Sequence, residues 1–466
     1  MTSFSSLLQP DRGQPARSVH AIDKAGHDDW VKTLPPRAKA AAAAQRFAGK
    51  AGELAILPGD NPEDWSAAIG VESAAALGPW DLAKAAETLP EGVFRLESGP
   101  GAALLGWLLA QHRFERYRKP ETSTGPRVLL TGDVARIDEA VRQAEAVALV
   151  RDLVNTPTED LGPVQLQEAV EQVANAHGAS VRATTGDVLE DGFPLVHAVG
   201  RAAARDRAPR LIELEWGDPA HPRIAIVGKG VCFDTGGLDI KPASGMRLMK
   251  KDMGGAAHAL ALAKLVMGGR LPVRLHLLIP AVENAISASA IRPGDVLRSR
   301  KGLTVEVSNT DAEGRLILAD ALTRAGEETP ELILDFATLT GAARVALGPD
   351  LPATFANDDS LAADLLAAGA DEADPLWRMP LWAGYDEMLR SDIADLDNAP
   401  EGGMAGAVTA ALFLQRFVEP QTLWSHFDTF AWRPAAKPGR PKGGEALGLR
   451  AAWAALRRRY LPDSKS

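Results

Sequence analysis

The sequence has little of what marks secreted, membrane-bound or nucleic-acid-binding proteins. Its single cysteine, Cys232, excludes a disulfide framework within the chain and favours a reducing compartment. No apolar run approaches the ~20 residues that a membrane helix needs, and Met1–Pro10 lacks the basic and apolar regions of a signal peptide. The formal net charge of -10 argues against general binding to nucleic acid. We therefore expect a cytoplasmic protein without a membrane partner and with nucleic acid as an unfavoured partner.

Three common catalytic motifs are also missing. There is no His-Glu-x-x-His zinc motif, no complete phosphate-binding loop around Lys229–Gly230, and no Gly-x-Ser-x-Gly nucleophile elbow. His258, His276 and His426 stand alone in the sequence, so we expect them to be core or helix-face residues. Cys232 lies between apolar neighbours and is expected to pack in the core. The chemistry must then be carried by other side chains.

What the chain does contain is a repeated order of strand and helix. Its 466 residues are enough for two or three domains, and 46% hydrophobic residues are ordinary for a globular protein. The expected strands and helices of the later part are strands over 211–216, 224–227, 271–280 and 332–337, and helices over 255–267, 316–325 and 405–417. This alternation predicts an α/β fold with a mixed, largely parallel sheet flanked by helices. Ligand sites in such sheets lie at the C-terminal ends of strands.

The alanine-rich first third also mixes short strands with helical patterns. We expect strands over 55–58 and 128–130 and a buried helix over 102–110. A helical pattern then runs from Asp138 to Val154, and Asn155–Pro157 ends it. We therefore divide the chain into a smaller N-terminal α/β domain over 1–137, a linking helix over 138–155 and a larger domain over 156–466.

The most informative stretch is the octapeptide Asn309–Leu316. A strand-like run, Leu303–Val307, leads into it, so we read the octapeptide as the extended end of a strand. Side chains at alternate positions of a strand face the same side, which would place Asp311, Glu313 and Arg315 together. Two carboxylates and a guanidinium on one side are typical of a metal-assisted hydrolase.

A second polar cluster lies upstream, among glycines that let the backbone approach a ligand closely. The two clusters together supply four candidate carboxylate ligands and two lysines: Asp234, Asp252, Asp311 and Glu313, with Lys229 and Lys241. Such a set can bridge two divalent ions ~3.5–4 Å apart and activate a water molecule between them. Taken singly, each aspartate is more simply a cap or a surface group, so the prediction depends on the whole set.

The polar segments resemble the leucyl aminopeptidase family of dinuclear metallopeptidases. Val227–Pro242 resembles the family's lysine-containing motif, Asp252–Ala257 its Asp-Met-Gly-Gly-Ala-Ala motif, and Asn309–Leu316 its signature octapeptide. The connecting stretches are similar as well: Pro280–Asn284, Arg292–Val296 and Ala337–Ala342. The resemblance covers roughly Ala148–Leu456, so it makes 156–466 a dinuclear metallopeptidase catalytic domain.

The resemblance implies a role for each matching residue. Asp234 and Glu313 would bridge two divalent metal ions. Asp311 would bind one ion through its side chain and its main-chain carbonyl, while Lys229 and Asp252 would complete the other, tighter site. The implied cofactors are Mn²⁺ or Zn²⁺, with Mg²⁺ also compatible, because hard oxygen ligands and an amine suit all three ions.

Two further residues are implied to be catalytic without binding metal. Lys241 would stay charged and stabilise the oxyanion that develops during hydrolysis. Arg315 would hold a bicarbonate ion that serves as the general base, because its planar guanidinium suits such an anion. Four positions are implied to lie near the first side chain of the substrate: Met249, Thr338, Leu339 and Gly341.

The implied function is a metal-dependent aminopeptidase that hydrolyses the N-terminal bond of peptides through a two-metal-activated water, with leucine-like or broad specificity. A homohexamer is implied too. The part before Asp138 shows little of the family's usual pattern, and a small α/β domain is expected there by position. Glu445, within Gly443–Gly448, falls in a segment that lies near the substrate pocket in relatives and would place an acidic group there.

Two other functions compete with this one. The basic runs Arg298–Lys301 and Arg457–Arg459 are compatible with a DNA-binding architectural member of the same family, although a solvated basic face explains them more simply. A two-metal phosphoesterase would use the same ligand chemistry, but the lysine ligand and the aminopeptidase-like motifs argue against it. Peptide hydrolysis, DNA retardation in a gel and phosphate release distinguish the three functions.

Overall fold

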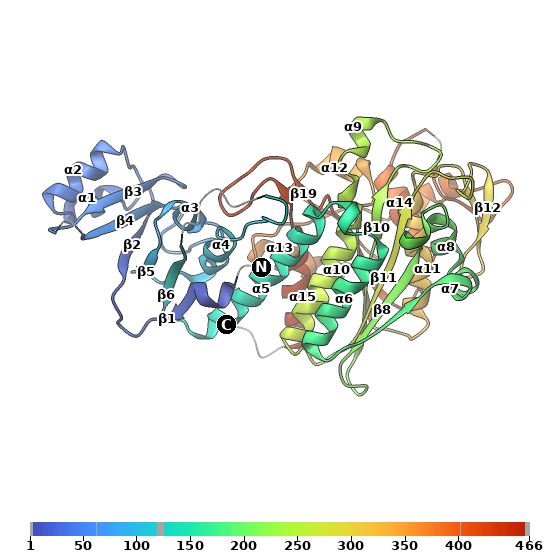
Figure 1. Ribbon diagram of the computed structural model, residues 1–466, viewed down its shortest axis with the longest axis horizontal. Coiled ribbons are helices and arrows are strands. Elements are labelled where there is room, and N and C mark those ends of the chain that lie inside the picture. The colour runs from blue at the N-terminus through green and yellow to red at the C-terminus, as the bar shows by residue number, and fades with distance from the viewer. Residues whose placement is uncertain (1–2, 62, 119–124, 401, 462–466) are drawn as a thin grey trace. The chain divides into compact units, whose positions relative to one another are not determined.

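The computed structural model describes residues 3–61, 63–118, 125–400 and 402–461 (Figure 1). The chain divides into two compact units, each built from sheet and helix. The first comprises Met1–Ala148 and Ala435–Lys442, and the second comprises Leu149–Pro434 and Gly443–Ser466. Within the described residues, no helix has both the length and the apolar character needed to cross a membrane.

The first unit contains a six-stranded sheet in the order β1-β6-β5-β2-β4-β3. Its strands are β1 (Leu8–Pro10), β2 (Arg17–Ile22), β3 (Leu54–Pro58), β4 (Trp65–Gly70), β5 (Gly92–Leu96) and β6 (Arg127–Thr131). Its helices are α1 (His27–Thr33), α2 (Pro36–Ala44), α3 (Ala83–Thr88) and α4 (Leu104–Leu109). All strand pairs are parallel except β3 with β4. Ala38 and Ala42 of α2 pack on Ala55 and Leu57 of β3, as expected for a small N-terminal α/β domain.

The second unit is organised around a nine-stranded sheet in the order β16-β15-β18-β14-β9-β11-β8-β7, with β10 also paired to β11. Its strands are β7 (Ser180–Thr184), β8 (Arg210–Trp216), β9 (Arg223–Gly228), β10 (Gly230–Asp234), β11 (Arg274–Asn284), β14 (Leu332–Ala337), β15 (Ala353–Ala356), β16 (Trp377–Arg378) and β18 (Leu423–Asp428). The central pairs are parallel, while β7, β8 and β15 pair antiparallel with their inner neighbours. The predicted mixed, largely parallel sheet is thus confirmed.

Smaller strands and the helices complete the second unit. The strands of the two small sheets are β12 (Asp295–Arg298), β13 (Thr304–Val307), β17 (Leu396–Asp397), β19 (Trp432–Arg433) and β20 (Gly443–Gly444). The helices are α5 (Ala135–Asn155), which begins in the first unit, α6 (Pro163–His177), α7 (Gly186–Gly192), α8 (Pro194–Gly200), α9 (Ala243–Met246), α10 (Gly254–Gly268), α11 (Glu313–Gly326), α12 (Gly341–Leu347), α13 (Asp359–Asp371), α14 (Gly406–Gln415) and α15 (Leu449–Tyr460). Helix α5 ends at Asn155, where the sequence predicted its end.

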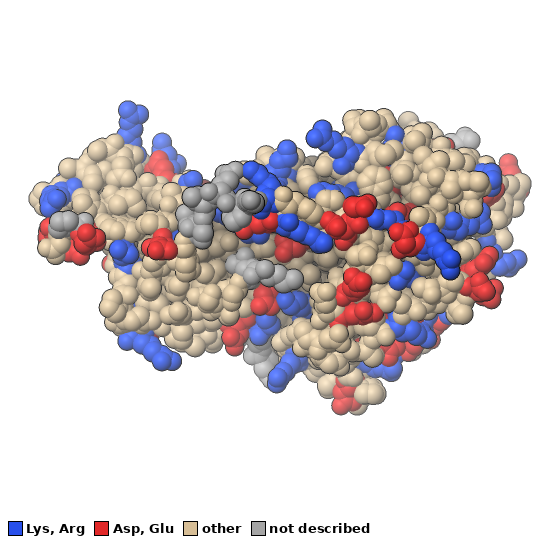
Figure 2. All heavy atoms as spheres, in the orientation of Figure 1, with Lys and Arg blue, Asp and Glu red and all other residues tan. Residues whose placement is uncertain are grey.

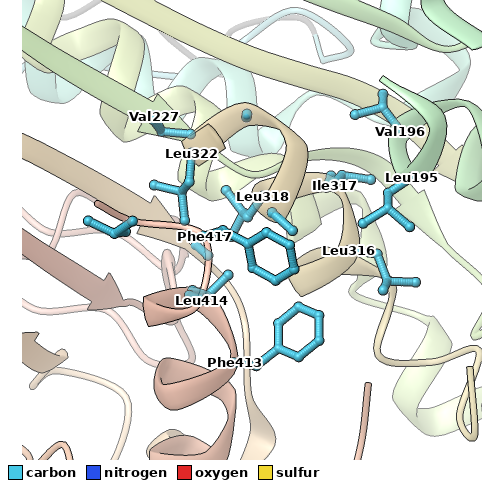
Figure 3. Close-up of a cluster of buried hydrophobic side chains, with 14 of the residues drawn as sticks. Leu195, Val196, Val227, Leu316, Ile317, Leu318, Leu322, Phe413, Leu414 and Phe417 are labelled. Carbon is cyan, nitrogen blue, oxygen red and sulfur yellow. The ribbon is translucent and has the colours of Figure 1, made fainter. Parts of the chain in front are cut away.

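Helices α11 and α14 share a hydrophobic cluster (Figure 3). Leu316 and Leu322 of α11 are fully buried in it, with Phe413 and Phe417 from and just beyond α14. The two phenylalanine rings lie 5.3 Å apart. Each such side chain contributes about 1.5–3 kcal/mol on burial, so the cluster holds α11 firmly in place. The N-terminus of α11 carries Glu313, so this packing positions a predicted metal ligand.

Candidate functional site

The site is built at a break between two strands. Strand β9 ends at Gly228 and β10 begins at Gly230, and both pair with β11, so Lys229 lies between them within the sheet. The Lys229 amide donates to the Phe336 carbonyl on β14, at 2.9 Å. This backbone frame aims the Lys229 side chain at the C-terminal ends of the parallel strands, where the sequence placed the ligand site.

Lys229 lies among oxygen atoms. Its Nζ is 2.8 Å from Asp252 Oδ2 and 3.0 Å from Glu313 Oε1, and it donates to the Thr338 carbonyl at 3.2 Å. Burial alone would lower the pKa of Lys229, but the charges of Asp252 and Glu313 outweigh it and hold that pKa above its ordinary value. A metal ion that takes Lys229 as a ligand must therefore displace a firmly held proton.

Three buried carboxylates converge around this lysine. Asp234 ends β10, Asp252 precedes α10 and Glu313 begins α11, and one oxygen from each lies within 4.8 Å of the others. Burial, followed by repulsion from Asp234, raises the pKa of Glu313 to about 8. Carboxylates crowded at this distance repel one another, and a multivalent cation relieves that repulsion. The donor set therefore fits divalent ions.

Asp311 adjoins this group through Lys241. Lys241 Nζ lies 2.9 Å from Asp234 Oδ2 and also contacts Asp311 Oδ1. Burial and the neighbouring Asp234 raise the pKa of Asp311 to about 6. For Lys241, burial is outweighed by Asp234 and Asp311, so its pKa stays above the ordinary value and its charge is retained. The structure thus brings all five predicted metal ligands and Lys241 into one place.

The octapeptide is not the extended strand end that the sequence analysis expected. Strand β13 ends at Val307 and α11 begins at Glu313, so Glu313 and Arg315 are helical. Residues two positions apart on a helix do not face the same side. Glu313 accordingly faces Lys229, while Arg315 Nη1 donates to the Asn398 carbonyl at 2.7 Å.

Asn398 holds the loop before α11. Its Oδ1 accepts from the amides of Ser308 and Asn309, at 3.0 and 3.2 Å, and its Nδ2 donates to the Asn309 carbonyl at 2.7 Å. Arg315 is buried, and burial lowers its pKa to about 10, so it remains charged at neutral pH. Its Nε has no hydrogen-bond partner among the described residues. A buried donor without an acceptor is costly, and an anion such as bicarbonate would satisfy it.

A cavity of about 320 Å³ opens beside the carboxylates. Its lining includes four of the five predicted ligands, Lys241 and all four positions predicted near the substrate side chain: Lys229, Asp234, Asp252, Asp311, Met249, Thr338, Leu339 and Gly341. Glu313 and Arg315 lie behind this lining, buried in α11. The cavity therefore gives a small molecule access to the carboxylate group from one side.

Sequence reasoning missed Asn284, and it missed the contact that Thr338, predicted only as a substrate-pocket position, makes with Asp252. Asn284, at the end of β11, donates to Asp234 Oδ1 at 2.9 Å and to Glu313 Oε2 at 3.4 Å. The Thr338 hydroxyl donates to Asp252 Oδ1 at 2.8 Å. Both residues fix carboxylates that the sequence identified. The sequence feature that could have identified Asn284 is its position as a polar residue at the end of a long apolar strand.

Glu445 does not lie in the cavity lining. Its carboxylate accepts from Arg151 Nη2 at 3.0 Å and from Arg433 Nε at 3.3 Å, and all three side chains are at most 2% exposed. The prediction that Glu445 places an acidic group in the substrate pocket is therefore wrong. The physical reason is that two buried guanidinium groups require a counter-charge, which Glu445 supplies.

The basic runs are compensated by acidic neighbours. Arg300 pairs with Glu327, and Arg458 pairs with Asp371. Basic and acidic side chains are interspersed on the face shown in Figure 2. Nothing in this arrangement supports the DNA-binding alternative. His258, His276 and His426 are fully buried and Cys232 is 1% exposed, so the expectation that they belong to the core is confirmed.

Known proteins share both the sequence pattern and the fold. The catalytic-domain model of the cytosol aminopeptidase family matches residues 148–452, which is more than half of the chain. The chain belongs to the cytosol aminopeptidase family. The N-terminal domain model of the same M17 aminopeptidases matches residues 18–130, where the sequence alone showed little of the family pattern. The resemblance to the leucyl aminopeptidases is thereby confirmed.

Individual cytosol aminopeptidase relatives cover nearly the whole chain. A probable cytosol aminopeptidase of Leifsonia xyli subsp. xyli is 41% identical over 96% of this chain and 97% of its own length. The crystal structure of cytosol aminopeptidase from Coxiella burnetii is 45% identical, with a TM-score of 0.92 over 97% of this chain and 99% of that one. The bottromycin maturation enzyme BotP in complex with Mn is 31% identical, with a TM-score of 0.86 over 96% and 100% of the two chains. This cytosol aminopeptidase-family chain is accordingly a hydrolase, a metallo-exopeptidase.

Proposed function

We propose that the enzyme removes the first residue of peptides by hydrolysis at a two-metal site in the cavity. The observation that carries the proposal is the convergence of Asp234, Asp252 and Glu313 on Lys229, with Lys241 and Asp311 alongside. The convergence combines hard oxygen donors, an amine and a retained cation in one buried group. These are the parts that two-metal peptide hydrolysis requires.

The ligands divide between two divalent ions. Asp234 and Glu313 would be shared by both ions, Lys229 and Asp252 would complete one ligand set, and Asp311 would complete the other. Mn²⁺ is our first choice, since a relative of the same fold has been solved with Mn, and Zn²⁺ and Mg²⁺ suit the same donors. When bound, such ions supply Lewis-acid polarisation of the peptide carbonyl and a nucleophilic water at neutral pH.

Lys241 and Arg315 act on the substrate and the water from the protein side. Lys241 keeps its charge beside Asp234 and stabilises the negative charge that develops on the carbonyl oxygen. Arg315 offers its buried, unpaired Nε to a bicarbonate ion, which serves as the general base. Because Asn398 fixes the other side of the guanidinium, the direction in which Arg315 presents Nε is set before an anion binds.

The cavity explains why the reaction is confined to the peptide's N-terminus. The proposed metal ligands line the cavity, so a bound ion could take a free α-amine there, and Met249, Thr338, Leu339 and Gly341 line the same cavity. A residue inside a longer chain has no free amine to offer. We assign these four positions to recognition of the first residue, within a leucine-like or broad range.

We also propose that the enzyme is a cytoplasmic homohexamer. Its relatives are named cytosol aminopeptidases, and the second unit exposes large apolar side chains, among them Trp377, Trp382 and Met404. Apolar side chains exposed in this way favour association between copies. Sedimentation should give the mass of six chains, and a monomer would contradict the hexamer.

The direct test is a peptidase assay. The Mn²⁺-loaded enzyme is expected to release p-nitroaniline from leucine p-nitroanilide and the first residue from a panel of dipeptides. Glu313→Ala removes a bridging ligand and should abolish turnover, whereas Glu327→Ala, at the other end of α11 and partly exposed, should leave it unchanged. An enzyme with full metal content that releases nothing from any substrate would refute the proposed function.

A further inference from the structure

One wall of the cavity carries two cations that the proposed mechanism does not use. Lys251 and Arg344 both line the cavity, and both face the ring of Phe430. Lys251 Nζ lies 5.4 Å and Arg344 Cζ 5.0 Å from the centre of that ring. A half-buried aromatic ring that contacts two cations makes this wall polar, whereas a leucine side chain packs best against an aliphatic wall.

Neither cation is neutralised in the way that the other lysines of the cavity are. Lys229 and Lys241 each have carboxylate oxygens within hydrogen-bonding distance. Lys251 is only 5% exposed, and the one carboxylate oxygen of the described residues within ion-pair distance, Asp252 Oδ1, is 3.8 Å away. Within the described part of the chain, no carboxylate forms an ion pair with Arg344, which is exposed at the rim. A nearly buried ammonium without a close counter-charge is costly.

We propose that Lys251 and Arg344 select peptides whose first residue is acidic, glutamate or aspartate. The inference rests on the proposed function and specifies its substrate class. Lys251 Nζ lies 3.8 Å from Asp252 Oδ1, and we assign Asp252 as a ligand of the ion that would take the substrate's α-amine. A carboxylate two or three bonds from the substrate's Cα would then come within reach of Lys251, while Arg344 offers a second cation beside the Phe430 ring.

The electrostatics of the loaded site favour the same assignment. Among the described residues, Asp252 is the one carboxylate within ion-pair distance of the Lys251 ammonium, and a divalent ion bound by Asp252 would compete for that carboxylate. An acidic substrate side chain restores the lost counter-charge. A leucine side chain would leave the Lys251 ammonium unpaired and dry, which disfavours it.

Asp428, the acidic residue of the cavity lining that we do not assign as a metal ligand, does not invert this preference. Asp428 Oδ1 accepts from the amides of Leu339 and Thr340, at 3.1 and 3.2 Å, and Oδ2 accepts from the Thr340 hydroxyl at 2.6 Å. Both of its oxygens are thus used to hold the loop that precedes α12. Three of its roughly four acceptor positions are thus occupied, which weakens its attraction for a basic first residue, whereas an acidic first residue finds two cations.

The experiment compares kcat/KM for p-nitroanilides of glutamate, glutamine, aspartate, asparagine, leucine and lysine on the Mn²⁺-loaded enzyme. Anilides are used because a dipeptide's own carboxylate could occupy the cations. We expect glutamate to exceed glutamine by about 10- to 100-fold, the range for a hydrogen bond to a charged group. Lys251→Met and Arg344→Met should each reduce this ratio while leucine p-nitroanilide is cleaved at least as well as before.

Lys250→Met is the matched control. Lys250 is the neighbouring lysine, but its Nζ donates to the Asn155 carbonyl at 2.6 Å and lies over Trp432, outside the cavity lining. It should keep the glutamate-to-glutamine ratio. If Lys251→Met does not fold, the wild-type ratio and the exposed Arg344→Met still decide.

Three outcomes are possible. A high glutamate-to-glutamine ratio that falls in the two variants supports the inference. Cleavage of the leucine anilide with a ratio near one, or a ratio that both variants preserve, overturns the inference and leaves the proposed function intact. Failure to cleave any anilide or peptide at full metal content overturns the proposed function, and the inference with it.

Discussion

Substitution of Gly314 by alanine tests whether Lys229 is a metal ligand. The substitution should change metal affinity strongly while it changes the stability of the fold only a little. A Cβ atom at Gly314 would lie 2.6 Å from Lys229 Nζ and Cε and 2.8 Å from Cδ. Ordinary contact begins at 3.4 Å, so the Lys229 side chain would have to retreat by roughly 1 Å. That retreat moves Nζ away from Asp252 and Glu313, which it now meets at 2.8 and 3.0 Å.

Gly314→Ala has two opposing effects on the free energy of unfolding but only one effect on metal affinity. Alanine in place of glycine within α11 should stabilise the helix by about 1 kcal/mol. Overpacking against Lys229 should cost about 1–3 kcal/mol, so the net change in the free energy of unfolding is small. Displacement of a ligand, by contrast, should lower metal affinity about 10- to 100-fold, as changes around metal ligands commonly do. Gly314→Ala should therefore fold but bind metal weakly.

Calorimetric titration of the metal-free protein with Mn²⁺, together with thermal unfolding of the same samples, measures both quantities. Gly326→Ala, at the other end of α11, is the control, because its Cβ would meet Glu419 at an ordinary 3.5 Å. The control should keep wild-type affinity and be as stable or slightly more stable. If Gly314→Ala binds Mn²⁺ and turns over substrate like the wild type, Lys229 does not serve as a ligand from this position.

Two further predictions concern buried charges. Glu445→Ala should lower the free energy of unfolding by about 3–5 kcal/mol, because it leaves Arg151 and Arg433 buried without their counter-charge, and it should leave the order of preferred substrates unchanged; chemical unfolding and the anilide panel check both parts. Burial alone would raise the pKa of Glu213, but hydrogen bonds, the largest from His276, outweigh it and lower that pKa to about 2 from 4.5. A depressed pKa stabilises the fold above about pH 4.5, and that stability, at most about 3 kcal/mol, is lost as the pH falls towards 2. Glu213→Gln should thus be less stable at neutral pH, and its free energy of unfolding should fall less than that of the wild type between roughly pH 6 and pH 3, as measured by urea unfolding. An equal fall in both proteins would show that Glu213 does not cause the loss of stability in acid.

The sheet of the second unit could be predicted because buried parallel strands leave a strong sequence signal. Strand β9 is apolar after Arg223, β14 is apolar except for Asp335, and α10 is apolar on nearly every side. The start of α11 was missed for a local reason. Its N-cap is Ala312, whose side chain cannot accept a capping hydrogen bond. The strand that precedes the octapeptide therefore led us to predict an extended conformation for it.

The candidate ligands could be identified from residue type and spacing, but their supporting contacts could not. Asn284 reaches Glu313 across 29 positions, and Glu445 reaches Arg151 across 294. No period or local motif encodes such pairs, because they exist only once the sheet has brought distant segments together. The acidic group that the sequence placed by the substrate pocket was misplaced for this reason.

The hydrogen bonds by which Asn398 holds the loop before α11 have a consequence for the order in which the enzyme folds and binds metal. The octapeptide is a local motif, yet its loop is fixed by a residue 89 positions downstream of Asn309. Contacts of such sequence separation form late in folding. On the ribosome, the chain must therefore be extended well past α11 before the loop before it can settle. We therefore expect metal uptake to come late in the maturation of the enzyme, because a nascent chain cut short before Asn398 would carry all five candidate ligands but not the residue that fixes the loop before α11.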